Sequence, residues 1–133
     1  MKRIEGIIPT ERLSKVNDAL RNVGVGGVTC FDTRGRGQVP IQQRIAGRAG
    51  LFTPEFNTNS TIMVVVKDAD ADKVINAILE AASTGLAGEG KVFVTHVDDV
   101  IDIGSKKRGE EALAPLPPIW PPDVPSDEEE KKR

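Results

Sequence analysis

Three glycines and one lysine between positions 84 and 94 are the residues best suited to chemistry in this chain. Gly85, Gly88 and Gly90 lack a Cβ, so the backbone around them can turn tightly and approach a ligand closely. Lys91 adds a positive charge beside the exposed amides, a combination that suits an anion such as phosphate. The spacing differs from that of a Walker A loop. Taken alone, the loop is explained equally well as a plain connection between a helix and a strand.

The composition argues against several other chemistries. The chain has 133 residues, enough for one domain with a real core, and its net charge of −2 gives no case for nucleic acid. Cys30 is the only cysteine and His96 the only histidine, so a zinc site of the usual kind is not expected. Counting residues leaves a Ser-His-Asp triad open, but no nucleophile motif accompanies His96, and we predict no enzyme.

The same two residues and the N-terminus lead to predictions about the cellular compartment and about local burial. A single cysteine allows no intramolecular disulfide and favours a reducing compartment, and its apolar neighbours predict a small buried side chain. We expect His96 to be a partly exposed strand residue. Neither a signal-peptide pattern nor an apolar run of membrane-spanning length occurs, so the predicted location is cytoplasmic.

The elements that must position these residues form two strand–helix–strand units. Strands are predicted over residues 2–8, 25–33, 60–67 and 91–103, which are rich in alternating apolar or β-branched residues. Each predicted helix has an apolar face at three- and four-residue steps. These faces are Leu13, Val16, Leu20 and Val23 in the first helix, and Val74, Ile75, Ile78, Leu79 and Ala82 in the second. Thr10 is the expected N-cap of the first helix, Gly24 its end, and Asp68 or Asp70 the N-cap of the second.

This order predicts an α+β fold, a ferredoxin-like βαββαβ sandwich with both helices on one face of the sheet. Residues 62–66 and 92–94 are apolar on both sides, so the second face needs cover, and we expect an oligomer. Residues 114–125 carry six of the nine prolines and favour an extended polyproline-like segment. The charged residues 126–133 are expected to be disordered. Trp120 either packs on a neighbouring surface, which we favour, or docks to a partner.

Five ordered blocks of the sequence resemble the PII signalling family. They are residues 1–8, 24–29, 34–37, 82–94 and 108–113, and the glycine–lysine loop with its flanks is the most specific. The resemblance implies a domain over residues 1–113, with a long T-loop at about 35–58 between the second and third strands, and a C-terminal tail over 114–133. It implies a homotrimeric sensor that is not an enzyme. Such a sensor binds ADP, AMP or ATP between its subunits and contacts a regulated enzyme or transporter through the T-loop.

The resemblance also assigns a candidate site, with no catalytic residue, metal or permanent cofactor. Residues implied around adenine and ribose are Ile7, Gly27, Val28, Thr29 and Val65. The base of the T-loop supplies Gly35, Arg36, Gly37 and Gln38. The phosphates are implied to lie against Gly88, Glu89, Gly90 and Lys91.

Several positions depart from the family pattern. Val39 stands where the family has a glutamine that helps to hold magnesium and 2-oxoglutarate, and residues 55–60 lack the family's lysine. Asp102 and Gly104 replace two arginines that reach the β- and γ-phosphates, although Lys106 and Lys107 could compensate in part. The chain has no tyrosine to be uridylylated. These changes predict that ADP and AMP bind at least as well as ATP, without magnesium-dependent binding of 2-oxoglutarate.

The T-loop has its own charge pattern. Residues 33–56 contain four arginines (Arg34, Arg36, Arg44 and Arg48) against Glu55. This favours a contact surface for an anion or an acidic partner, while a solvated loop with scattered charge stays open as the alternative. The pattern resembles the PII-like branches linked to carboxysomes and inorganic carbon transport, which implies bicarbonate as a second ligand. The other candidates are conventional nitrogen control, acting on ammonium transport or glutamine synthetase, a nucleotide hydrolase, and a scaffold that docks through Trp120.

Overall fold

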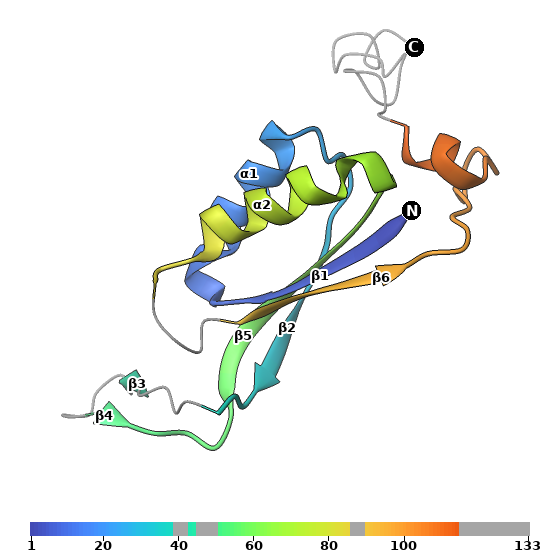
Figure 1. The fold of residues 1–133 in the computed structure, drawn as a ribbon. Helices are drawn as coiled ribbons and strands as arrows, with labels where there is room; N and C mark the ends of the chain where they lie inside the picture. Colours follow the sequence, from blue (N-terminus) through green and yellow to red (C-terminus); the bar gives the residue numbers. More distant parts are fainter. Residues whose placement is uncertain (39–42, 45–50, 86–89, 115–133) are drawn as a thin grey trace, which may run out of the picture.

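The computed structural model describes residues 1–38, 43–44, 51–85 and 90–114 (Figure 1). Its main sheet has four strands in the order β2-β5-β1-β6, all paired antiparallel. The strands are β1 (Lys2–Ile8), β2 (Thr29–Gly35), β5 (Asn57–Val66) and β6 (Lys91–His96). Helices α1 (Leu13–Asn22) and α2 (Ala71–Ala82) cover one face of this sheet, so the predicted ferredoxin-like α+β sandwich is confirmed.

Shorter elements connect the main ones. The strands β3 (Gln43–Arg44) and β4 (Leu51–Phe52) pair with each other within the predicted T-loop and form a separate two-stranded sheet. Three 3₁₀ helices, η1 (Thr10–Arg12), η2 (Asp68–Asp70) and η3 (Gly109–Leu113), precede α1, precede α2 and follow β6. The expectations for the tail, including the packing of Trp120, concern residues outside the described part of the chain from 115 onward.

The core lies between the sheet and the two helices. Every second residue is buried there from Ile4 to Ile8 in β1 and from Ser60 to Val66 in β5, because side chains alternate between the faces of a strand. Gly6 faces this core, and a Cβ at its position would meet the Ile62 and Ile78 side chains at 3.4 and 3.5 Å, which are ordinary van der Waals distances. The main contributors are Ile4, Ile8, Val16, Leu20, Ile62, Val64, Val74 and Ile78. The opposite face of the sheet is open and carries Phe31 and Phe93, each 47% exposed.

The helix ends differ in part from the prediction. Gly24 ends α1 as expected, with a φ of +89°. Its N–H donates to the Arg21 carbonyl, and the Val25 N–H donates to the Leu20 carbonyl at 2.9 Å. These two bonds form a Schellman motif. Thr10, however, is not the N-cap of α1, because it begins η1 and its hydroxyl accepts a bond from Ser60 Oγ. Asp70 occupies the N-cap position of α2 without a capping bond from its side chain.

Three strand boundaries also differ. The second strand begins at Thr29 rather than at residue 25, because Val25 belongs to the helix cap and two glycines follow it. The third strand extends from Asn57 to Val66. The fourth ends at His96 rather than at residue 103, because its partner β1 begins at Lys2, directly opposite His96.

The predictions for the single cysteine and histidine have different outcomes. Cys30 is exposed rather than buried, because β2 is an edge strand and only α1 approaches it from one side. The His96 side chain is 63% exposed at the end of β6, as predicted.

Candidate ligand-binding site

Gly90 is held tightly against β1. A Cβ at this position would lie 1.7 Å from the Ile7 carbonyl oxygen, and the φ of Gly90 is +135°. Both the space and the backbone conformation therefore require glycine. Lys91 follows directly and pairs with Ile7 in the β1–β6 ladder, with its side chain exposed. Gly88 and Glu89, the other half of the predicted phosphate cradle, lie outside the described residues.

The predicted base of the T-loop lies further along the sheet in the same direction, on the opposite edge strand, because Gly35 is four residues beyond Phe31, which shares a row with Thr61, Ile7 and Lys91. Gly35 is the last residue of β2 and pairs with Asn57. Thr33 fixes this end of the ladder, because its hydroxyl donates to Asn59 Oδ1 and lies 3.0 Å from Thr61 Oγ1. Arg36, Gly37 and Gln38 follow Gly35 and are exposed. We call this end, with Ile7, residues 35–38, Gly90 and Lys91, the Lys91 end.

The remaining predicted residues lie elsewhere. Thr29 begins the strand that Gly35 ends, about 20 Å away at the usual rise per residue. Val65 pairs with Arg3 and is half-buried on the open face of the sheet. Gly27 and Val28 lead into β2, and Val28 packs partly against the core. We call this part of the molecule, together with the segment that follows β6, the Met1 end.

One chain therefore does not bring all the predicted site residues together. In addition, the cavity beside Lys91 is apolar and measures about 130 Å³, with Ile78, Ala82 and Gly90 among its lining residues. Pockets for drug-sized ligands usually measure about 300–1,000 Å³. Within the described part of the chain, the predicted site residues therefore fall into separate groups.

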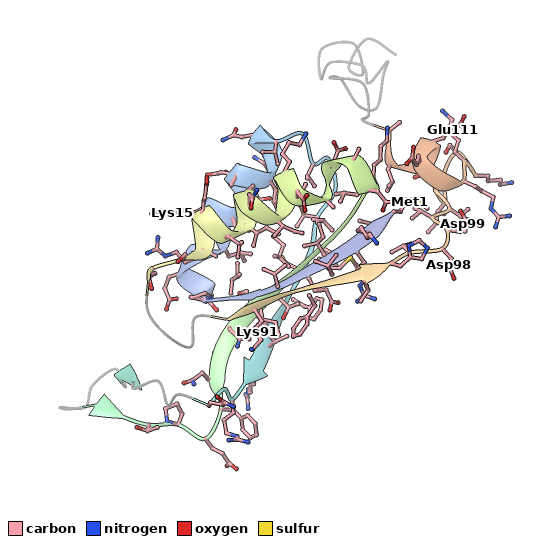
Figure 2. All side chains as sticks on the ribbon, viewed as in Figure 1. Met1, Lys15, Lys91, Asp98, Asp99 and Glu111 are labelled. Atoms are coloured by element: carbon pink, nitrogen blue, oxygen red, sulfur yellow. The ribbon has the colours of Figure 1, made fainter. Side chains whose placement is uncertain are left out.

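A network around Asp99 orders the Met1 end. Figure 2 shows Asp98, Asp99 and Glu111 near Met1, with Lys91 at the other end of β6. The Asp99 carboxylate accepts bonds from Arg108 Nε at 2.9 Å and Nη2 at 2.6 Å, and from the N–H groups of Val100 and Gly109. The Arg108 guanidinium and these amides lower the pKa of Asp99. The Val97 N–H donates to the Met1 carbonyl, which ties the segment to β1.

Asp102 has a structural role in a turn that the sequence analysis did not predict. Its carboxylate accepts bonds from the Ser105 N–H and hydroxyl, both at 2.8 Å, and these bonds lower its pKa. Two backbone bonds close the same turn: the Lys106 N–H donates to the Asp102 carbonyl, and the Asp102 N–H donates to the Lys107 carbonyl. Lys106 has a φ of +62°, unusual for a residue with a side chain. Asp102 therefore shapes the turn that presents Lys106 and Lys107, and the Asp-x-x-Ser spacing was the available signal.

The described residues show no cluster of histidine, cysteine or acidic side chains that could hold a metal ion. Nor does the described part of the chain contain a helix that is long and apolar enough to span a membrane.

Comparisons with known proteins identify the family of this chain. The family described as "Nitrogen regulatory protein P-II" matches residues 1–107. Nitrogen regulatory protein P-II 2 of Methanothermobacter thermautotrophicus is 37% identical over 114 residues, which cover 85% of this chain and 97% of that protein. Nitrogen regulatory protein P-II of Azospirillum brasilense is 35% identical over 113 residues, 85% of this chain and all of that protein. The crystal structure of Arabidopsis thaliana PII bound to citrate superposes with a TM-score of 0.69 at 35% identity, covering 84% of this chain and 90% of that one.

The βαββαβ sandwich, with a long insertion after its second strand and a glycine–lysine loop before its fourth, defines a class of small signal-transduction proteins. This chain belongs to the nitrogen regulatory protein P-II family. Proteins of this family are regulatory and are not enzymes, as the sequence analysis predicted.

Proposed function

We propose that this protein is a homotrimeric sensor that binds adenine nucleotides between its subunits and acts on a partner protein through the T-loop. The observation that carries the proposal is the separation of the predicted ligand residues along the sheet. Gly35 lies about 20 Å from Thr29 at the far end of β2, and Lys91, which pairs with Ile7, lies four rows from Val65, which pairs with Arg3. Two copies that place the Lys91 end of one against the Met1 end of the next would complete the site.

The open face of the sheet supports such an assembly. Phe31 and Phe93 are both about half-exposed on this face, which the helices leave uncovered. The contact between unlike ends is heterologous, and a heterologous contact that closes on itself forms a ring. The two ends also carry opposite net charge, because residues 97–113 hold five acidic and three basic side chains, whereas the T-loop is rich in arginine. A trimer is the ring that the family resemblance implies.

The phosphate partners favour ADP and AMP at least as much as ATP. Lys91 is the one cation of the glycine–lysine loop, and Asp102 and Gly104 stand where the family has arginines. Each lost charge-assisted hydrogen bond removes about 1.5–3 kcal/mol of binding free energy. Lys106 and Lys107, on the turn that Asp102 holds, offset part of this loss. The third phosphate of ATP therefore gains few new partners.

Bicarbonate is the second ligand of this proposal. A small anion needs a positive charge and a few donors, and the exposed Arg34 and Arg36 supply both near the T-loop base. The alternative is conventional nitrogen control through ATP, ADP and 2-oxoglutarate. The description of the family and the names of the relatives favour that alternative, while Val39 and the missing lysine oppose it.

Isothermal titration of the purified protein with ATP, ADP, AMP, 2-oxoglutarate and bicarbonate tests the ligand assignment. We expect Kd values for ADP and AMP at or below that for ATP, and no magnesium-dependent binding of 2-oxoglutarate. Tight magnesium-dependent binding of ATP together with 2-oxoglutarate would establish nitrogen control instead. If no nucleotide binds, the proposed function is wrong.

Mixed trimers test whether the site lies between subunits. Lys91→Gln disables one half of the site, and Gly27→Val blocks the other half at a position where an added Cβ meets nothing within 4 Å. We expect each variant to lose ADP binding. Refolding the two variants together would then restore about a quarter of the sites, those formed by one intact half from each chain. If the mixture binds no better than either variant, the site lies within one chain.

A further inference from the structure

An apolar strip lies between α2 and β6 on the helix side of the sheet. Of the residues of β6 that face this side, Val92 packs partly on the core, whereas Val94 is 46% exposed. Leu79 of α2 is 50% exposed and lines the apolar cavity at the Lys91 end together with Val92. Ile75 lies one helical turn before Leu79, on the same side of α2. We call Ile75, Leu79, Val92 and Val94 the apolar strip.

The described part of the chain leaves this strip uncovered. β6 is an edge strand, and residues on both of its faces are exposed. Folded proteins usually cover or charge such an edge, because its unpaired N–H and C=O groups attract other strands. The open face that supports the proposed assembly is on the other side of the sheet, so it does not by itself provide a partner for the strip.

The described chain ends on the helix side of the sheet. Figure 1 shows η3 beyond the Met1 end of β6, at the level of the helices and near the N-terminal end of α2 in this view. Ala114 follows η3 and is the last described residue. The next eight residues, 115–122, read Pro-Leu-Pro-Pro-Ile-Trp-Pro-Pro and carry no charge. Trp120 among them is the only tryptophan of the chain.

We propose that residues 115–122 dock on the apolar strip of their own chain, with Ile119 and Trp120 packed against α2 and β6. Prolines favour an extended polyproline conformation, which loses little entropy when it docks on an apolar surface. This conformation has three residues per turn, so Leu116 and Ile119 lie on one side and can face the strip together. Five of the eight residues are prolines without an N–H, which prevents pairing beside β6 as a further strand. The contact is therefore made by side chains.

The length of the segment fits the length of the strip. The six steps from Ala114 to Trp120 cover about 19 Å in a polyproline conformation. The eight steps from Ala71, at the start of α2, to Leu79 cover about 12 Å. Along β6, the four steps from His96 to Val92 cover about 13 Å. A segment that leaves η3 near the start of α2 can therefore place Trp120 on the strip.

Two other apolar surfaces are poorer targets. The cavity that Cys30 lines lies between α1 and β2, at the opposite edge of the sheet, so the segment would have to cross both helices to reach it. The open face carries Phe93, which is 47% exposed, but this residue points away from the side on which η3 lies. The apolar strip is the surface that the segment meets first.

Pairs of engineered cysteines locate the docked segment in the full-length chain. In a Cys30→Ser background, Val94→Cys with Ile119→Cys should form a disulfide when oxidised glutathione accepts the two electrons. The control Glu80→Cys with Ile119→Cys places the partner on α2 but turned away from β6, and should stay mostly reduced. A bond within one chain leaves a monomer on a non-reducing gel, and we expect that product.

The other outcomes of this trapping overturn the inference. Equal trapping of Val94→Cys and Glu80→Cys would show a tail that samples the whole helix side. Preferred trapping of Phe93→Cys would place the segment on the open face. Covalent dimers in place of monomers would assign the contact to a second copy, and no disulfide in any pair would leave the strip without this occupant.

The fluorescence of Trp120 gives an independent test. We expect acrylamide to quench Trp120 less in the folded full-length protein than in the urea-unfolded chain. Leu79→Gln should raise the quenching toward the unfolded value, while Glu80→Gln, the next exposed residue on α2, should leave it unchanged. Because residues 115–122 carry no charge, the protection should persist at high salt. Quenching of the folded protein equal to that of the unfolded chain would overturn the docking.

These results are distinguishable from those that test the proposed function. A protein that binds ADP but shows no trapping at Val94→Cys would keep the proposed function and lose the docked tail. A protein that shows trapping at Val94→Cys and protection of Trp120, but binds no nucleotide, would keep the docked tail and lose the proposed function.

Discussion

The Lys91 end and the Met1 end of one sheet use their charged residues in different ways. At the Met1 end, the described charges serve the fold: Asp99 binds Arg108 and two amides, Asp102 closes a turn, and Asp68 binds the N-terminal ammonium at 3.0 Å. At the Lys91 end, Gly90 brings the start of β6 into close contact with β1, while the adjacent Lys91 makes no ion pair with described residues. Order at one end and an unpaired cation at the other are compatible with the proposed site between two copies.

Replacing Gly90 should produce the largest effect, because it attacks the packing that holds the Lys91 end. In Gly90→Ala the new Cβ would lie 1.7 Å from the Ile7 carbonyl oxygen, in a backbone conformation that side chains disfavour. Either β1 or β6 must move. We expect the free energy of unfolding, measured by urea denaturation, to fall by about 3 kcal/mol or more.

Two other glycines separate the causes of that loss. Gly85→Ala shares a positive φ but has open space, so it should cost about 1 kcal/mol. Gly27→Ala has open space and no unusual φ, and should change stability by less than about 0.5 kcal/mol. If all three variants were equally stable, the close approach of Gly90 to β1 would not hold this end together.

Lys91→Gln should weaken ADP binding without affecting the fold. The exposed ammonium makes no ion pair with described residues, so its removal leaves no buried charge behind. Losing one charge-assisted bond to phosphate should raise the Kd for ADP, measured by titration calorimetry, at least about 10-fold. Lys15→Gln, on α1 and away from both ends in Figure 2, is the matched control and should bind like the wild type. Equal affinities in the two variants would exclude Lys91 from the site.

The contrast between the ends shows what could be predicted from sequence and what could not. The fold was predictable, because the apolar periods of β1, α1, β5 and α2 are strong and the elements follow one another in a simple order. The position of Gly90 and Lys91 followed from the glycine spacing. The strand ends did not, because a strand stops where its partner stops: β6 ends at His96 only because β1 begins at Lys2.

The separation of the predicted site residues in the fold was also beyond sequence reasoning. A list of candidate residues does not show which residues lie opposite one another. The pairing of β2 with β5 places Thr29 opposite Met63 and Gly35 opposite Asn57. Asp102 shows a further limit. In the sequence alone, Asp102 is a negative charge where the family has an arginine. In the structure, its bonds to Ser105 stabilise a turn.

Acidification should loosen the Met1 end before the Lys91 end. The bond to Arg108 holds the pKa of Asp99 below its ordinary value of 3.8. The stability contributed by a group with a lowered pKa is present above the ordinary value and is lost as the pH falls through the lowered one. We expect the NMR amide signals of Val100 and Gly109, which donate to Asp99, to shift toward random-coil positions in that range.

Asp99→Asn should remove this pH dependence, since the amide does not titrate and keeps one acceptor oxygen. The control is Asp98→Asn: the Asp98 side chain is fully exposed and contacts only His96, at 3.4 Å, among the charged groups described. Amides that respond identically to acid in wild type and Asp99→Asn would show that another group orders residues 97–109.

Asp102→Asn should have the smallest effect, because it changes one exposed charge at the Met1 end and retains an oxygen for Ser105. An exposed charge is largely screened, so we expect the affinity for ATP to rise about 2-fold relative to ADP in calorimetric titrations. Asp102→Ala removes the turn as well, and should lower the affinity for both nucleotides if Lys106 and Lys107 act from that turn. A gain above about 10-fold for ATP in Asp102→Asn would contradict this reasoning. It would mean that the charge of Asp102, rather than the absence of two arginines, sets the nucleotide preference, and that the Met1 end repels the third phosphate directly.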